Sequence, residues 1–179
     1  MQILPSNRLS YRLVTREDKQ DLFDLDQDPE VMLHLNGGKP SSMEEIEDIW
    51  IPRMEKYATP EKGWGIWHVS LTETGDFLGF ILMRPMGFFT GTPDHQDLET
   101  GWRFFKHTWG KGYATEAAKH LMTEIAKTQP IKSYSAIALK DNVASVAVMK
   151  KLGMTFIKEA KNEDPQFGDE LVVYYRVDI

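Results

Sequence analysis

Residues 109–115 read Trp-Gly-Lys-Gly-Tyr-Ala-Thr and carry the strongest structural information in the chain. They follow an alternating apolar pattern that predicts a strand over 98–105, and they precede a helical pattern that starts near Thr115. A helix that starts there directs free backbone N–H groups and the positive end of its dipole at the loop, which favours a bound pyrophosphate. Gly112 lets the backbone approach such a ligand closely, and Lys111 adds positive charge.

Two other phosphate-binding motifs do not fit this loop. A Walker A loop needs Ser or Thr directly after Gly-Lys, where this chain has Gly112, and a dinucleotide fingerprint needs a third glycine near Thr115. Taken alone, Gly110 and Gly112 are also compatible with a strand-to-helix turn that binds no ligand. The two glycines alone therefore do not distinguish a phosphate-binding loop from a turn that binds no ligand, and the flanking sequence is needed to do so.

Composition indicates a soluble globular protein. With 179 residues, of which 41% are hydrophobic and 27% charged, we expect one domain spanning residues 1–179. No export signal or membrane-spanning run is evident, and the absence of cysteine excludes disulfides and thiolate zinc sites, so we expect a cytoplasmic protein without membrane contact.

A net charge of −6 argues against a nucleic-acid partner and is compatible with a cationic small molecule or a basic peptide. The same charge fits a protein that is merely kept soluble by it.

Periodicity predicts the element order β-α-α-β-β-β-α-β-α-β-β, without repeats or linkers. Capping boxes at Thr15 and Ser42 predict the first two helices, the second over 42–56, and Asp28-Pro29 interrupts the first before a short apolar turn at 31–33. We expect the long helix after residue 115, another helix over 142–152, and a mobile loop over 85–97. The predicted strands cover residues 9–13, 64–71, 77–84, 98–105, 134–139, 155–157 and 171–177.

Several segments together resemble one enzyme family. They are Arg8–Arg12, Asp28–Met32, Glu99–Phe104, Trp109–Ala117, Asn142–Ser145 and Lys151–Met154. These segments span nearly the whole chain and are similar to the GNAT N-acetyltransferases, in particular to the branch that acetylates the N-termini of ribosomal proteins. The resemblance implies an α/β (α+β) fold, with a mostly antiparallel twisted sheet of six to seven strands and helices on both faces. The sheet is expected to splay between its fourth and fifth strands.

The resemblance also implies how acetyl-CoA binds. The backbone of Trp102, Arg103 and Phe104 would pair with the pantetheine arm as though it were an extra strand. Asn142 would face the thioester end, and it would also serve as the N-cap of the helix that follows it. The pyrophosphate would be held by the amides of Gly110, Lys111, Gly112, Tyr113, Ala114 and Thr115.

The catalytic groups are less clearly marked. Many GNAT enzymes place a proton-donating tyrosine seven residues after the asparagine, where this chain has Met149. In the branch it resembles, a serine three residues after the asparagine is the substitute, which here is Ser145; its alternative role is a local bond to the helix backbone. The position at which some relatives carry a base is Ile137. Glu99 is therefore the remaining candidate base, acting through water, unless it is an ordinary solvated glutamate.

The acceptor is expected to be an amine. Neutralising a lysine at pH 7 costs about 4.6 kcal/mol, against about 1 kcal/mol for an α-amine, so a site without a strong base suits protein N-termini. The alternatives are a lysine, a polyamine or an aminoglycoside as acceptor, or a non-catalytic module that only binds acyl-CoA. Acceptor choice would lie in residues 42–56 and 85–97. The histidines lack metal-ligand spacing, so we expect no metal, and exposed edge strands with Phe88-Phe89 are compatible with a homodimer.

Overall fold

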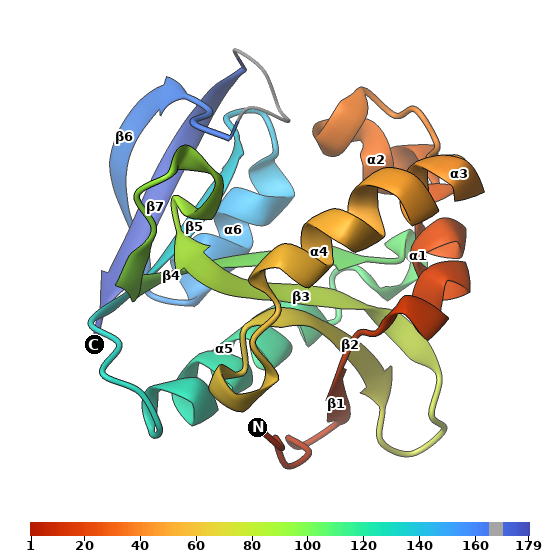
Figure 1. Ribbon diagram of the computed structural model, residues 1–179, viewed down its shortest axis with the longest axis horizontal. Coiled ribbons are helices and arrows are strands. Elements are labelled where there is room, and N and C mark those ends of the chain that lie inside the picture. Colours follow the sequence, from red (N-terminus) through yellow and green to blue (C-terminus); the bar gives the residue numbers. More distant parts are fainter. Residues whose placement is uncertain (165–169) are drawn as a thin grey trace.

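The computed structural model describes residues 1–164 and 170–179, and these contain one seven-stranded sheet (Figure 1). The strand order is β1-β2-β3-β4-β5-β7-β6, and every neighbouring pair is antiparallel except β4 with β5. The expected α/β architecture is therefore confirmed. The strands are β1 (Leu9–Leu13), β2 (Gly65–Leu71), β3 (Phe77–Met86), β4 (Asp94–Phe104), β5 (Ser133–Leu139), β6 (Thr155–Lys161) and β7 (Leu171–Asp178).

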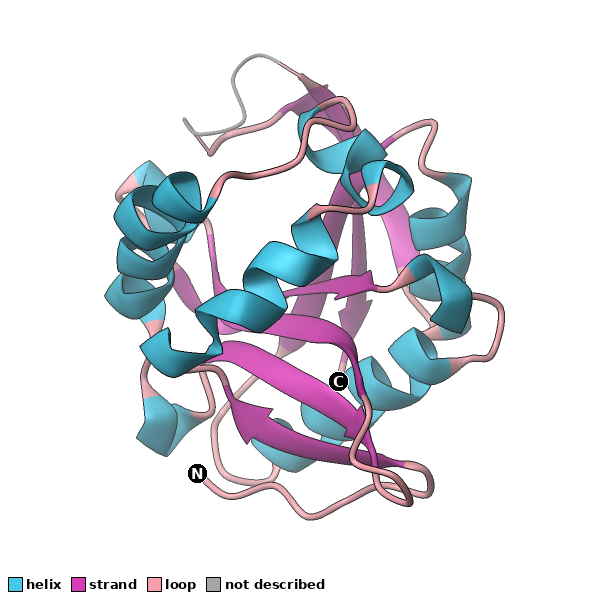
Figure 2. Ribbon diagram, turned by 90° about the vertical axis from the view of Figure 1, so that its right-hand side faces the viewer, coloured by secondary structure: helices cyan, strands magenta, loops and turns pink. Residues whose placement is uncertain are grey.

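Helices cover both faces of the sheet, as the side view in Figure 2 shows. The α-helices are α1 (Lys19–Asp26), α2 (Pro29–Asn36), α3 (Met43–Glu45), α4 (Ile51–Tyr57), α5 (Tyr113–Ala126) and α6 (Val143–Lys151). One apolar core forms where α5 packs Leu121 and Ile125 against strand residues such as Trp67 and Ile81. A second core lies on the opposite face, where α1, α2 and α4 pack against Phe80 of β3. Each face thus has its own core.

The chain contains a helix where the sequence predicted only an apolar turn at 31–33. That prediction was wrong because both ends of α2 carry strong local signals. The Asp28 side chain accepts a hydrogen bond from the Glu30 amide, and Pro29 occupies the first turn, where its missing N–H is not needed. Gly37 then ends the helix in the left-handed region, with φ of 71°. The extra helix adds a wall to the cavity described below.

Pro52 does not end the second predicted helix but is accommodated inside it. Residues Ile46–Trp50 form one turn of π-helix between α3 and α4, in which the Ile51 amide reaches back to the Ile46 carbonyl. The wider turn shifts the hydrogen-bond pattern just before the proline, which has no N–H to donate. The Ser42 capping box that predicted the start of this helix is confirmed, since Ser42 and Glu45 exchange bonds of 2.8 and 3.0 Å. The helical run therefore continues to Tyr57.

The predicted loop over 85–97 is shorter than expected, because both of its ends are strand. β3 extends to Met86 and β4 starts at Asp94, with a register shift that pairs Met86 with Asp94 directly after Pro85 with Leu98. A single 3₁₀ turn, Phe88–Thr90, lies between the two strands. Phe88 and Phe89 are half-buried and pack near Tyr57, so they do not form the exposed apolar pair that we took as compatible with a dimer.

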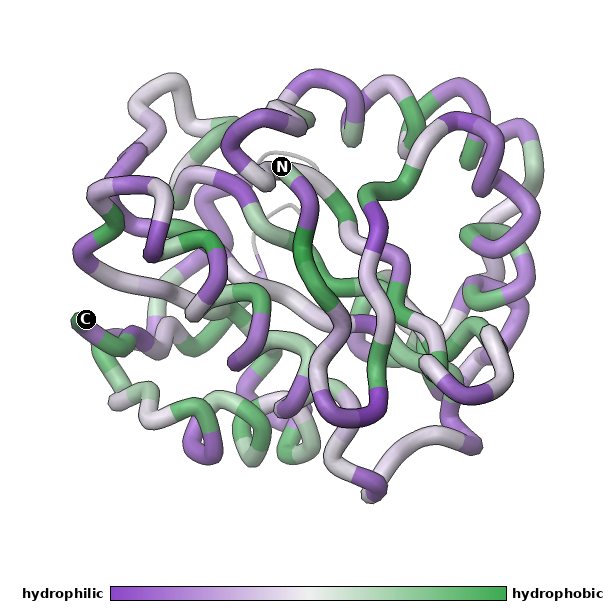
Figure 3. The backbone as a smooth tube through the Cα atoms, turned by 90° about the horizontal axis from the view of Figure 1, so that it is seen from below, coloured by the Kyte–Doolittle hydropathy of each residue, from purple (hydrophilic) through white to green (hydrophobic). Residues whose placement is uncertain are grey.

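Hydrophilic and hydrophobic residues alternate over short distances along the chain (Figure 3). Among the residues that the structure describes, no helix is both long enough and apolar enough to cross a membrane.

Candidate active site

The sheet opens between β4 and β5. These strands pair only at Asp97–Glu99 with Ser133–Ser135, whereas β4 stays paired with β3 as far as Phe104. Likewise, β5 stays paired with β7 as far as Leu139. The facing edges beyond Glu99 therefore carry backbone groups that do not bond to each other across the gap. The predicted splay between the fourth and fifth strands is confirmed.

A cavity of about 660 Å³ occupies this opening and continues under α4. It is lined by Glu99, Trp102, Arg103, Phe104, Gly110, Gly112, Tyr113, Ala114, Thr115, Asn142 and Ser145. The structure thus brings together every residue predicted for the site except Lys111. The side chain of Lys111 is exposed and does not line the cavity. Its backbone carbonyl instead accepts a hydrogen bond from Arg8 at 3.1 Å.

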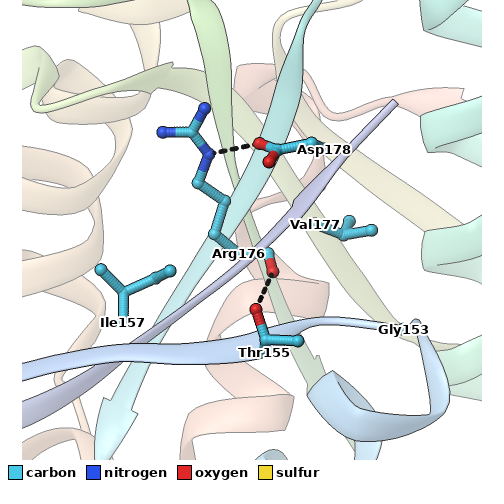
Figure 4. A pocket seen from close by; sticks show the side chains of 6 residues that line it. All are labelled: Gly153, Thr155, Ile157, Arg176, Val177 and Asp178. Carbon is cyan, nitrogen blue, oxygen red and sulfur yellow. Dashed lines mark hydrogen bonds and ion pairs between the residues drawn. The ribbon is translucent and has the colours of Figure 1, made fainter.

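A second hollow of about 490 Å³ lies on the outer strands β6 and β7 (Figure 4). Its polar groups form hydrogen bonds with one another. The Arg176 side chain donates to Asp178 at 2.8 Å, and the Thr155 hydroxyl donates to the backbone carbonyl of Arg176 at 3.4 Å. None of the residues predicted for the site lines it. The larger cavity is therefore the candidate active site.

The N-terminus of α5 points into the cavity without a side-chain cap. Gly112 is the N-cap residue in the left-handed region, with φ of 82°, and Gly110 has φ of 74°. The Glu116 amide bonds to the Gly112 carbonyl at 3.0 Å, so the amides of the preceding first-turn residues lack helical acceptors. Fourteen aligned residues add their dipole to this end. The loop is therefore suited to hold an anion.

Arg8 and Glu116 fasten this loop from outside the cavity, which the sequence did not predict. The Arg8 side chain and backbone amide both donate to the Glu116 carboxylate, at 2.7 and 2.9 Å, and Ser6 donates to it at 2.8 Å. The Arg8 guanidinium also lies 4.5 Å from the centre of the Tyr113 ring. Together with its bond to the Lys111 carbonyl, this arrangement joins the N-terminal segment to the anion-binding loop. It also places positive charge beside the loop.

Replacing Glu116 by Gln is expected to lower the free energy of unfolding by about 1 kcal/mol at pH 7. Burial alone would raise the pKa of Glu116, but the Ser6 hydroxyl and Arg8 lower it below the ordinary value of 4.5. A lowered folded-state pKa stabilises the protein above about pH 4.5, and this stabilisation is lost as the pH falls through the folded pKa. Urea unfolding from pH 3 to 8 should therefore show a loss of unfolding free energy in the variant that is constant above about pH 4.5 and becomes smaller at lower pH. The exposed Glu73→Gln serves as control, and an equal, constant deficit in both variants would contradict the assignment.

Glu99 lies at the apex of the opening and is ion-paired with Arg84. The Arg84 guanidinium donates to both carboxylate oxygens, at 2.8 and 3.1 Å; Arg84 is buried, and the Glu99 side chain is 13% exposed. Burial alone would lower the pKa of Arg84, but the Glu99 carboxylate outweighs it, so the pKa is raised and the guanidinium stays charged. The ordinary solvated role considered for Glu99 is therefore wrong. Accepting a proton would require Glu99 to give up part of this pair, so its role as a base stays a prediction.

Ser145 and Asn142 lie on the opposite side of the opening, at the start of α6. The Asn142 side chain accepts a hydrogen bond from the Ser145 amide at 3.1 Å, which confirms its role as the N-cap. The Trp102 indole N–H of β4 donates to the Ser145 hydroxyl oxygen at 3.2 Å. Because an indole can only donate, the hydroxyl hydrogen of Ser145 stays available for another acceptor. Met149 is buried in the core.

The remaining titratable residues that the structure describes show no cluster typical of a metal site. Within residues 1–164 and 170–179, no group of three or more His, Asp or Glu side chains is arranged to hold a metal ion. His68 is buried between Phe77 and Asp21, and burial lowers its pKa. It lies outside the lining of the cavity.

Comparison with known proteins agrees with this geometry. The sequence profile described as the acetyltransferase (GNAT) domain matches residues 8–155. The uncharacterized protein YkkB of Bacillus subtilis is 28% identical, over 97% of this chain and 94% of that protein. The FsC-acetyl coenzyme A-N(2)-transacetylase of Aspergillus fumigatus is 27% identical, over 89% of this chain and 68% of that protein.

Among solved structures, the ribosomal L7/L12 alpha-N-protein acetyltransferase RimL in complex with coenzyme A superposes with a TM-score of 0.75. The match is 18% identical and covers 100% of this chain and 98% of that one. This likeness concerns the fold, whereas the profile match covers most of the chain. The chain therefore belongs to the GNAT family of acetyltransferases and is an acetyl-CoA-dependent acetyltransferase.

Proposed function

We propose that this enzyme transfers the acetyl group of acetyl-CoA to the N-terminal α-amine of a protein or peptide, by direct attack in a ternary complex. The opening between β4 and β5 is the observation that carries the proposal. β4 presents an unpaired backbone edge beyond Glu99, and the uncapped N-terminus of α5 lies at the same cavity. An extended pantetheine arm fits the first feature and a pyrophosphate fits the second.

The loop also fits the phosphates sterically. Gly112 lines the cavity without a side chain, so the backbone can approach a phosphate closely, and the Arg8 guanidinium lies 3.6 Å from where a β-carbon would stand. Trp102, Arg103 and Phe104 supply the backbone edge, and Gly110 to Thr115 supply the amides. Asn142 would lie near the thioester end, where its carboxamide already orders the first turn of α6.

In the reaction, the neutral amine nitrogen attacks the carbonyl carbon of the thioester, the carbon–sulfur bond breaks, and the departing thiolate takes up a proton. We assign that proton to Ser145, and the bond from the Trp102 indole supports the assignment because it uses the hydroxyl oxygen as acceptor and leaves the hydrogen for another group. The proton lost by the amine passes to water. Glu99 would relay that proton only by loosening its pair with Arg84.

The pairing of Glu99 favours an α-amine over a lysine as acceptor. Both oxygens of the Glu99 carboxylate accept bonds from the buried Arg84 guanidinium, so taking a proton from the acceptor would break part of this pair. An acceptor that is already partly neutral near pH 7 does not require this step. The name of RimL, an alpha-N-protein acetyltransferase of the same fold, supports this choice.

The proposal is tested with one peptide in two forms that share an internal lysine, the first with a free N-terminus and the second with a blocked one. Thiol release from acetyl-CoA should require the free N-terminus, and mass spectrometry of the product should place a single acetyl group on the α-amine. Acetylation of the lysine in both forms would contradict the proposal. Turnover with spermidine or kanamycin, together with no turnover of either peptide, would also contradict the proposal.

A further inference from the structure

The part of the cavity beneath α4 is walled by aromatic and apolar side chains. We call it the aromatic chamber and define it by Trp50, Met54, Tyr57, Phe88 and Phe89, all of which line the cavity. The first three come from the π-turn and α4, and the two phenylalanines come from the turn between β3 and β4. The chamber is continuous with the β4–β5 opening. It is therefore the space in which the acceptor's own side chain would lie.

The rings of the chamber are held in place by their contacts with one another. Tyr57 meets Phe88 and Phe89 edge-on, with ring centres 5.7 and 6.1 Å apart, and the two phenylalanines meet edge-on at 5.1 Å. Tyr57 is only 5% exposed, and burial raises its pKa to about 12, so its hydroxyl stays neutral. The chamber thus presents fixed apolar surface, which contributes most when it covers an apolar group.

The two arginines at the chamber each pair with a carboxylate. Arg84 pairs with Glu99, Arg53 pairs with Asp164, and Arg53 also stacks 3.6 Å above the Phe89 ring. Among the described residues, four of the five carboxylates that line the cavity are ion-paired: Glu30, Glu99, Glu163 and Asp164, with Glu170 the fifth.

A second ammonium group on the acceptor would meet an unfavourable environment here. It would have to shed water next to the Arg53 and Arg84 guanidinium groups, and it would compete with them for Asp164 and Glu99. Drawing Glu99 away would weaken the pairing of the buried Arg84, and drawing Asp164 away would weaken that of the partly buried Arg53. The chamber therefore disfavours acceptors that carry several positive charges.

We infer that the aromatic chamber binds the first side chain of the acceptor, and that it selects a large apolar or aromatic residue next to the reactive amine. This inference rests on the proposed acetylation of α-amines and adds the residue type to it. Peptides that begin with Phe, Leu or Met are the preferred acceptors. Peptides that begin with Ser or Ala leave the chamber unfilled, and polyamines and aminoglycosides are poor acceptors.

The test uses pentapeptides that are identical except for a first residue of Phe, Leu, Met, Ala or Ser, together with spermidine and kanamycin. The three large apolar residues should exceed Ser and Ala in kcat/KM by about 10- to 100-fold, which is the discrimination an apolar pocket typically provides. Calorimetry of the same peptides with the CoA-bound enzyme should rank them alike. This second measurement reports the preference whether or not turnover occurs.

Phe88→Ala should lower kcat/KM for the Phe peptide about tenfold and change that for the Ala peptide by less than about threefold, with Phe88→Leu restoring most of the loss. The matched control is Phe156→Ala, since Phe156 is 54% exposed on the outer strand β6. Affinity for acetyl-CoA should be unchanged in all three variants.

Equal rates and affinities for the Ser and Phe peptides would overturn the inference while leaving α-amine acetylation in place. Binding that favours the Phe peptide, without acetylation of any peptide, would support the chamber assignment and overturn the proposed function. Preference for spermidine or kanamycin would overturn both.

Discussion

Gly112→Val is expected to weaken acetyl-CoA binding by about 100-fold or more while the protein stays folded. Gly112 adopts φ of 82° at the uncapped start of α5, and a branched side chain there would occupy the space beside the anion-binding amides. Each hydrogen bond lost to a charged phosphate oxygen costs about 1.5–3 kcal/mol, so the loss of two accounts for the expected factor. Calorimetric titration of the purified variant with acetyl-CoA measures it.

A matched control separates this steric effect from backbone strain. Gly75, in the turn between β2 and β3, has φ of 78° and open space around its α-carbon. Gly75→Val therefore carries a similar conformational penalty, about 1–3 kcal/mol, far from the cavity. Both variants should lose similar thermal stability, and only Gly112→Val should lose affinity. If Gly112→Val bound acetyl-CoA as tightly as Gly75→Val, the anion-binding role of the loop would be refuted.

Ser145→Ala is expected to lower kcat by about 100-fold and to leave the KM for acetyl-CoA nearly unchanged. The substitution keeps the backbone amide that bonds to Asn142, so the start of α6 is preserved. It removes the hydroxyl hydrogen that Trp102 leaves free. Because the missing group is a proton donor to the thiolate, raising the pH should not restore the rate. A missing base would instead become less important as the acceptor loses its proton.

Single-turnover rates from pH 6 to 9 are the appropriate measurement, since product release can mask the chemical step. Ser145→Thr retains a hydroxyl and should recover a large part of the activity. Wild-type rates for Ser145→Ala over the whole pH range would show that solvent supplies the proton. The enzyme would then act mainly by holding amine and thioester together.

The parts of the fold that could be predicted from sequence are those with local signals. The Ser42 capping box, the apolar face of α5 and the glycine-containing loop each lie within a few residues, and each is found where it was expected. The start of α2 carried similar signals at Asp28 and Pro29, but these were read as an interruption of the first helix. Pro85 was likewise read as a loop former, although it lies in β3 next to the register shift.

The parts of the site that could not be predicted depend on contacts between distant residues. Arg8 reaches Glu116 across 108 positions, and Arg53 reaches Asp164 across 111. Arg84 and Glu99 are closer in sequence, but only the β3–β4 register makes them direct neighbours. No periodicity encodes such pairs. Sequence therefore selected Glu99, which does line the cavity, but it could not show that both carboxylate oxygens accept bonds from Arg84.

Because β4 and β5 pair only at Asp97–Glu99 with Ser133–Ser135, the sheet consists of two parts that meet along this short ladder. We call the two parts plates and the ladder between them the seam. The first plate, β1 to β4, carries the helices of the aromatic chamber. The second plate is formed by β5 to β7, and α6, which contains Ser145, follows β5 in the chain.

Side-chain contacts across the seam include Trp102 with Ser145, Ser135 with Asp97, and Arg53 with Asp164. The proposed acetyl-CoA edge on β4 and the aromatic chamber both belong to the first plate, whereas Ser145 belongs to the second. The angle at the seam therefore sets how far Ser145 lies from the proposed thioester position, so a substitution at Ser135 or Asp97 would act on that alignment without changing the lining of the cavity.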